Sequence, residues 1–281
     1  MLRTINILSE YEKLYTDYVV NKKTRGSTNF FVNKNIISKY IYEGKVKCEV
    51  VDGALFILID QGDFYRLYFC GLTNLVQRLP IMDKDVCCDI YEQQKNDTHI
   101  IFFHNLLLAS GFVCQQKYEQ VRLFYGYLHK LSVRYLEKYS KKLSNVGMVM
   151  RSVAIDDKKY VEELIADNMG KYNGFSIEDD DWDEQVKKGN VVGLYIYEKL
   201  IGVYYFTTKA GRIIVDSDYR GRNLSVILRM YFASQKRWEF STTNQYDWAE
   251  ADNISSKRTF EKLLAIYTGK IKYRYVYNYS K

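Results

Sequence analysis

An internal repeat is the feature of this sequence that most restricts its fold. Each half of the chain predicts a helix that stops at a glycine and is followed by two strands joined by a short turn. In the first half these elements are helix 36–41 with Gly44 and strands 50–59 and 64–70. In the second half they are helix 182–188 with Gly189 and strands 191–197 and 200–207. We therefore expect α/β (α+β) architecture in two units, each a mixed central sheet flanked by helices.

The two halves also end alike, in a helix, a glycine and a strand. The predicted helices are 99–110 and 253–267, and the strands that follow them are 118–124 and 271–279. Between the halves, residues 128–145 predict an amphipathic helix with Lys and Arg on one face. We expect domains at 1–127 and 148–281, with 128–147 as the connecting helix and linker.

The composition is typical of a globular protein with a large core. Of the 281 residues, 47% are hydrophobic and 16% are aromatic. The longest purely apolar run, Ala54 to Ile59, is too short to cross a bilayer, and the N-terminus lacks the apolar core of a signal peptide. The five cysteines form no Cys-x-x-Cys pair and the three histidines show no metal spacing. These features predict a cytoplasmic protein with no membrane segment and no metal site.

The net charge of +7 is partly concentrated on the polar face of the predicted helix 128–145. Such an excess is more typical of a solvated helix face than of a nucleic-acid site, so we do not expect a nucleic-acid partner. The sequence does not indicate an oligomeric state.

The strongest functional signal is a strand, a polar turn and a helix in the second half. Residues 213–215 predict the strand, and the apolar spacing that begins at Leu224 predicts the helix. At such a turn, backbone N–H groups point outward from the positive end of a helix, a geometry that binds phosphate or pyrophosphate. The expected phosphate-binding residues are Arg220, Gly221, Arg222, Asn223, Leu224 and Ser225. The alternative is an ordinary strand-to-helix loop with no ligand.

The second half has Val215, the turn 219–222, Asn253 and the segment 260–263 in this order. In these residues it resembles a GNAT-family (Gcn5-related) N-acetyltransferase domain. In the first half, residues 107–112 and the strand through 118–119 resemble the closing segment of the same fold. That half has no Arg-Gly-x-Gly turn, since the equivalent region 72–79 contains only Arg78. The resemblance implies two tandem GNAT-like domains, of which the first has lost its cofactor loop.

The resemblance also implies a cofactor, acetyl-CoA or another acyl-CoA acting as co-substrate. Its pyrophosphate would bind the turn 220–225, and its pantetheine would run as an added strand beside Ile214 and Val215. Asn253 would face the cofactor arm, and Phe260 would lie near the thiol.

The sequence departs from the family pattern at two places. This chain has Asn223 and Ser225 in place of the glycines of the pattern Arg/Gln-x-x-Gly-x-Gly/Ala, although Asn tolerates unusual backbone angles better than most residues and Ser is small. Family members often carry a tyrosine general acid where this chain has Phe260, which has no proton to give. The general acid is therefore unassigned.

Glu250 is the candidate general base. Strand alternation over 246–251 places Tyr246, Trp248 and Glu250 on one face, where the aromatic rings would desolvate the carboxylate and raise its pKa. The alternative is a solvated glutamate on a half-exposed strand. Asn253 has the alternative role of a helix N-cap, and Phe260 that of a core residue.

Together these features favour an acyl-CoA-dependent N-acyltransferase, in which a small-molecule amine attacks the thioester directly in a ternary complex. Two alternatives stay open. One is a non-catalytic tandem module that binds acyl-CoA or a protein partner. The other is a tRNA-dependent aminoacyl transferase, because such enzymes also pair two GNAT-like domains.

Overall fold

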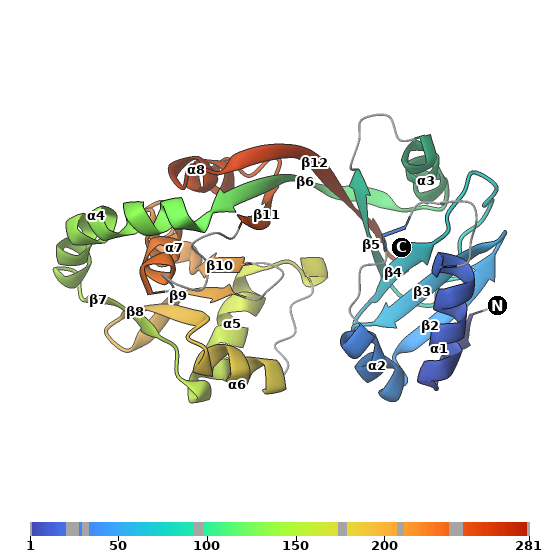
Figure 1. Cartoon of the computed structure of the whole chain (residues 1–281), viewed down its shortest axis with the longest axis horizontal. Coiled ribbons are helices and arrows are strands. Elements are labelled where there is room, and N and C mark those ends of the chain that lie inside the picture. The colour runs from blue at the N-terminus through green and yellow to red at the C-terminus, as the bar shows by residue number, and fades with distance from the viewer. Residues whose placement is uncertain are drawn as a thin grey trace. The chain divides into compact units, whose positions relative to one another are not determined.

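The computed structural model describes residues 2–20, 28–29, 34–92, 98–173, 179–206, 211–235 and 244–279. The chain divides into two compact units, unit 1 with Met1–Tyr118 and Gly269–Lys281, and unit 2 with Glu119–Thr268. Strands β6 (Val113–Phe124) and β12 (Ile266–Tyr277) each run from one unit into the other (Figure 1). In the described ranges, no helix is long and apolar enough to cross a membrane.

This division differs from the expected domains, which placed the C-terminal segment with the second half. The reason is that β12 pairs antiparallel with β5 (Val86–Glu92) of unit 1 over seven residue pairs, from Ile271 opposite Glu92 to Tyr277 opposite Val86. Strand pairing between distant segments is set by which edges meet in the fold, and a local pattern does not reveal it.

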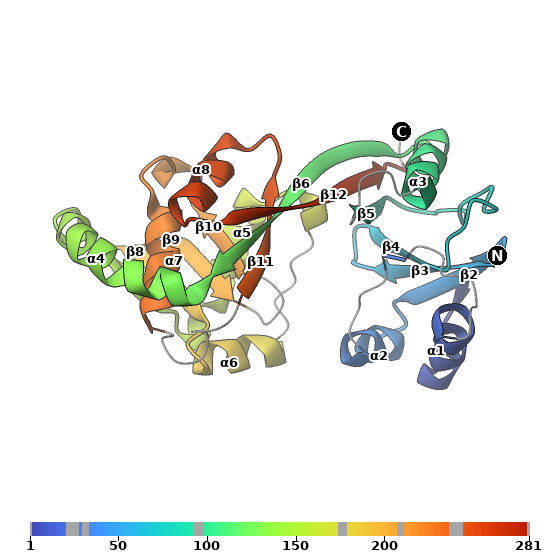
Figure 2. The same ribbon diagram turned by 45° about the horizontal axis from the view of Figure 1, so that its top comes forward.

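Unit 1 is a mixed sheet with helices on both faces. Its strands are β1 (Arg3–Thr4), β2 (Val46–Val51), β3 (Ala54–Asp60), β4 (Tyr65–Cys70) and β5, followed by β12. Helices α1 (Leu8–Tyr15) and α2 (Lys34–Tyr42) cover one face, and α3 (Thr98–Ala109) covers the other (Figure 2). The central strand β3 is buried along almost its whole length because both of its faces are covered.

The predicted strand 50–59 is wrong, since the structure has a hairpin there. Strands β2 and β3 are joined by Asp52 and Gly53, whose φ angles of 48° and 76° are both left-handed. Asp-Gly is a preferred pair for this tight type of hairpin turn. The apolar residues on both sides of it read as one continuous strand.

Unit 2 has a four-stranded antiparallel sheet in the order β10-β9-β8-β7. The strands are β7 (Met148–Ser152), β8 (Val191–Ile196), β9 (Lys199–Phe206) and β10 (Gly211–Val215). Thr207, the predicted end of β9, lies outside the described residues. Helices α4 (Tyr125–Ser144) and α7 (Leu224–Gln235) pack on one face, and α5 (Lys158–Asn168) and α6 (Asp179–Lys187) on the other. Strand β11 (Asn244–Glu250) lies beside β6, so β10 and β11 belong to different sheets.

The predicted helix 253–267 is too long. Helix α8 covers Ile254–Lys262 and ends where Leu264 takes a left-handed φ of 56°. The N–H of Ala265 donates to the carbonyl of Phe260 at 3.0 Å, and that of Leu264 donates to Glu261 at 2.9 Å. These two hydrogen bonds satisfy carbonyls of the last helical turn, so the helix ends there and the chain continues as β12.

Candidate functional site

The candidate site of unit 2 lies where β10 and β11 belong to different sheets and have no residue pairing in the described chain, an interruption that we call the opening. The two strands are linked by a hydrogen bond from the backbone of Gly211, the first residue of β10, to the carboxylate of Asp247 in the middle of β11. A Cβ at Gly211 would lie 2.3 Å from the Tyr204 hydroxyl and 2.6 Å from Gln245 Nε2, so only glycine fits there. Within the described residues, β10 is the edge strand of the four-stranded sheet.

A buried polar network surrounds the side chain of Asp247. Arg229 Nη2 donates to Asp247 Oδ2 at 2.7 Å, and the side chains of the pair are only 2% and 6% exposed. The Tyr125 hydroxyl donates to Gln245 Oε1 at 2.5 Å and lies 2.7 Å from the Tyr204 hydroxyl. Burial raises the pKa of Asp247, and the adjacent guanidinium of Arg229 opposes that shift. The network therefore ties α7 and α4 to β9 and β11 beneath the opening.

The polar turn expected to bind phosphate lies between the end of β10 and the start of α7. Gly221 and Asn223 both take left-handed φ angles, 79° and 63°. Asn223 precedes the first helical residue, and its carbonyl accepts from the Ile227 N–H at 3.1 Å. The first N–H groups of α7 have no carbonyl one turn earlier to bond with, so they are available to a ligand.

Two positive side chains lie at this turn, Arg222 within the turn and Lys262 from α8. The Arg222 guanidinium lies over the Tyr219 ring, 5.6 Å from its centroid. Lys262, the last residue of α8, donates through Nζ to Asn223 Oδ1. Sequence reasoning gave Lys262 no role, because the contact joins residues 39 positions apart and only the packing of α8 beside α7 creates it.

Arg220 is held by the protein itself. Its Nη2 donates to Asn168 Oδ1 at 2.6 Å and its Nε donates to the Val215 carbonyl at 3.1 Å. Arg220 thus joins the turn to α5 and β10 through these two hydrogen bonds.

The remaining phosphate-site residues connect α7 to the core. Leu224 is buried and packs in the α4–α7 core, while Ser225 Oγ lies 3.2 Å from Thr259 Oγ1 of α8. Ile214 is buried toward α5, and Val215 packs on the α7 side at the end of β10. The structure therefore brings residues 214–215 and 220–225 together at one end of the opening.

Glu250 and Asn253 lie together at the end of β11. Along this strand Gln245, Asp247 and Ala249 are buried, whereas Tyr246 is 46% exposed and Glu250 is half-buried. Asn253 caps α8 by accepting the Ser256 N–H at 2.9 Å, and its Nδ2 lies 3.5 Å from Glu250 Oε2. The N-cap role of Asn253 is present in the structure, and the same side chain contacts the candidate base.

Phe260 is a core residue, 8% exposed, whose ring lies 5.5 Å from the Arg229 guanidinium. Within the described ranges, no group of three or more His, Cys, Asp or Glu side chains is placed to hold a metal ion.

No protein-family model and no curated protein matches this sequence. Solved structures do match over nearly the whole chain. A GCN5-related N-acetyltransferase from Sphaerobacter thermophilus has a TM-score of 0.53 at 10% identity, covering 99% of this chain and 95% of its own. An acetyltransferase of the GNAT family from Colwellia psychrerythraea has a TM-score of 0.50 at 11% identity, covering 99% and 100%.

A third match is the GCN5-related glucosamine N-acetyltransferase region of a fungal multi-domain GH3 β-N-acetylglucosaminidase. It has a TM-score of 0.55 at 9% identity and covers 98% of this chain and 38% of that one. The chain therefore has the GNAT fold, as its sequence predicted, in a mixed α/β architecture of two units. At identities of 9–11%, the likeness shows the fold alone.

Proposed function

We propose that unit 2 is an acyl-CoA-dependent N-acyltransferase with acetyl-CoA as the expected donor and a small-molecule amine as acceptor. The observation that carries the proposal is the position of β10, which is the edge strand of the four-stranded sheet in the described chain and leads into the left-handed turn and the N-terminus of α7. This arrangement fits both ends of an acyl-CoA, an extended amide-bearing arm and a pyrophosphate.

The residues of the turn fit the phosphates. A Cβ at Gly221 would meet nothing within 4 Å, so its backbone faces open space. The first N–H groups of α7 would bind phosphate oxygens, and Arg222 and Lys262 would neutralise their charge. The left-handed φ of Asn223 supports the view that asparagine serves in place of the family's glycine.

The acyl-CoA supplies a thioester carbonyl for the amine to attack. Backbone N–H groups of β10, the edge strand, would polarise that carbonyl. Glu250 would take a proton from the ammonium form of the acceptor, held in place by Asn253. The direct transfer requires no covalent intermediate on the protein.

The non-catalytic alternative has one observation in its favour. Phe260 packs in the core without a proton to donate, so no general acid is assigned to the leaving thiolate. A module that binds acyl-CoA without turnover would show binding but no acyl transfer to any amine. The tRNA-dependent alternative would show salt-sensitive tRNA binding instead.

Calorimetric titration with acetyl-CoA tests the proposal. We expect micromolar binding by the unaltered chain and at least about tenfold weaker binding after combined Arg222→Ala and Lys262→Ala, since each removes a charge-assisted phosphate contact. Lys159→Ala is the matched control, because this lysine is 82% exposed on α5 and pairs only loosely with Glu163 at 3.8 Å. Absence of binding by the unaltered chain refutes the acyl-CoA proposal.

If binding is found, a screen of amine acceptors for CoA release separates an enzyme from a binding module.

A further inference from the structure

Unit 1 has its own opening between two parallel strands, and the chain fills it. Strands β4 and β5 pair in register only from Tyr65 opposite Val86 to Leu67 opposite Cys88. Beyond Leu67 and Cys88 the register ends, although β4 continues to Cys70 and β5 to Glu92. The resemblance implies that the acyl-CoA arm would run as an added strand beside the strand that precedes the phosphate turn, and in unit 1 the strand that precedes the equivalent segment 72–79 is β4. We call the region between β4 and β5 beyond this register the unit 1 opening.

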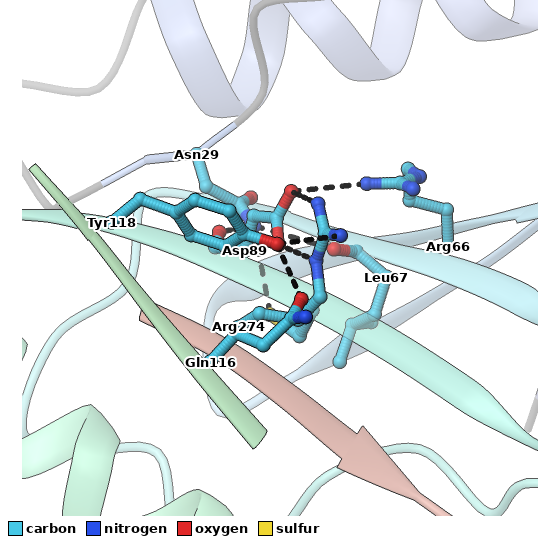
Figure 3. A network of polar contacts seen from close by, with 8 residues as sticks. Asn29, Arg66, Leu67, Asp89, Gln116, Tyr118 and Arg274 are labelled. Carbon is cyan, nitrogen blue, oxygen red and sulfur yellow. Dashed lines mark hydrogen bonds and ion pairs between the residues drawn. The ribbon is translucent and has the colours of Figure 1, made fainter. Parts of the chain in front are cut away.

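The side chain of Asn29 bridges the unit 1 opening (Figure 3). Its Nδ2 donates to the Leu67 carbonyl on β4 at 3.3 Å and to the Asp89 carbonyl on β5 at 2.8 Å. Its Oδ1 accepts the Phe69 N–H on β4 at 2.7 Å. One carboxamide thus uses both of its N–H groups and its oxygen on the facing edges of two strands.

The Asn29 backbone and the Thr28 side chain also bond to β4. The Asn29 N–H lies 3.4 Å from the Phe69 carbonyl, and Thr28 Oγ1 donates to the same carbonyl at 2.8 Å. Asn29 itself is only 3% exposed. Both backbone polar groups of Phe69, which an added ligand strand would need, are therefore already bonded within the chain.

An ion-paired carboxylate fixes the far side of the unit 1 opening. Asp89 Oδ1 accepts from Arg274 Nε at 2.7 Å, and its Oδ2 accepts from Arg274 Nη2 at 2.9 Å and from Arg66 Nη1 at 3.1 Å. Arg66 comes from β4 and Arg274 from β12, so the two arginines join β5 to the strands on either side of it (Figure 3). The strands bounding Asn29 are thereby held at a fixed separation.

Unit 1 also offers no free arginine in the region equivalent to the phosphate turn. Arg78, the one arginine of segment 72–79, donates through Nη2 to Glu49 Oε1 at 2.8 Å. The positive charge of Arg78, which a pyrophosphate would require, is thus paired with the carboxylate of Glu49 on β2.

We propose that the side chain of Asn29 fills the unit 1 opening and thereby prevents acyl-CoA from binding to unit 1. The consequence, which rests on the function proposed for unit 2, is that each chain binds one acyl-CoA and binds it through unit 2.

Hydrogen exchange tests the occupancy without any ligand. We expect the Phe69 amide to exchange at least about a hundredfold more slowly than an exposed amide, because its acceptor is buried. Asn29→Ala should remove most of that protection while leaving the amides of β8 and β9 in unit 2 unchanged. A Phe69 amide that exchanges freely in the unaltered chain, or that is indifferent to Asn29→Ala, overturns the proposal. If the Asn29→Ala variant does not fold, the exchange rate of the Phe69 amide in the unaltered chain decides whether Asn29 fills the unit 1 opening.

Stoichiometry provides the second readout. Titration with acetyl-CoA should give one site per chain, and Arg222→Ala with Lys262→Ala should weaken that single site. Two sites per chain, or one site of unaltered affinity in the double variant, would overturn the exclusion of acyl-CoA from unit 1. No binding at all by the unaltered chain would refute the function of unit 2, and the Phe69 exchange rate would still decide whether Asn29 occupies the unit 1 opening.

Discussion

The buried pair formed by Arg229 and Asp247 allows a sharp test of how unit 2 is stabilised. Truncating Asp247 to alanine leaves a guanidinium that is 2% exposed without its counter-charge. Two of its nitrogens, Nε and Nη1, already have no partner within the described chain, so no second acceptor compensates. Breaking a buried pair from one side typically costs about 3–5 kcal/mol, and we expect that loss in the free energy of unfolding of unit 2.

Tryptophan fluorescence is the appropriate assay, because Trp182, Trp238 and Trp248 all fall within the residue range of unit 2. Urea unfolding followed by this signal reports on unit 2 and avoids treating the whole chain as one transition. At about 2–4 °C per kcal/mol for a unit of this size, the same loss lowers Tm by roughly 6–20 °C.

The chain provides a matched control in an exposed pair of the same unit. Arg151 Nη2 lies 3.1 Å from Glu198 Oε2, but these side chains are 51% and 89% exposed. Glu198→Ala should therefore lower the free energy of unfolding far less than Asp247→Ala does. Joint replacement of Arg229 and Asp247 by Met and Leu should recover most of the loss, because no unpaired charge is left. If Asp247→Ala costs no more than Glu198→Ala, the reasoning from burial is wrong.

Three further predictions concern other parts of the molecule. Burial disfavours the charged form of Asp89, but hydrogen bonds from Arg274 and the charges of Lys272 and Arg66 outweigh it and hold its pKa well below the ordinary value. The contribution of Asp89 to the stability of unit 1 should be complete above about pH 4 and be lost as the pH falls toward its folded pKa. Hydrogen exchange of the β4 and β5 amides should show this loss in the unaltered chain, and the Asp89→Asn variant should not show it. Gly211→Ala should destabilise unit 2 by about 1–3 kcal/mol in urea unfolding, because the new Cβ overlaps Tyr204 and Gln245, and an unchanged midpoint would contradict the packing there. Glu250→Gln should lower kcat by about a hundredfold or more with little change in the KM for acyl-CoA, and an unchanged kcat would remove Glu250 as the base.

The sequence by itself determined the local elements and the class of fold. The glycine after α2 and the apolar spacing that predicts α7 are local signals, and the structure has these elements where they were expected. The strand–turn–helix around Gly221 was likewise predictable, because left-handed turns and helix starts are encoded within a few residues. The error at Asp52 missed a local signal, because Asp-Gly is itself a turn pair. The error at Leu264 falls where apolar residues continue past the end of the helix.

Tertiary structure alone decided which distant groups meet. Asn29 bonds to carbonyls 38 and 60 positions away, and Arg274 meets Asp89 across 185 positions. Strand β12 completes the sheet of unit 1 although it follows unit 2 in the chain. Hydrophobic period and turn chemistry act over a few residues, whereas the pairing of strand edges and of buried charges depends on the free energy of the whole packed chain. The hydrogen bonds of Asn29 between β4 and β5 and the edge position of β10 are therefore properties of the fold.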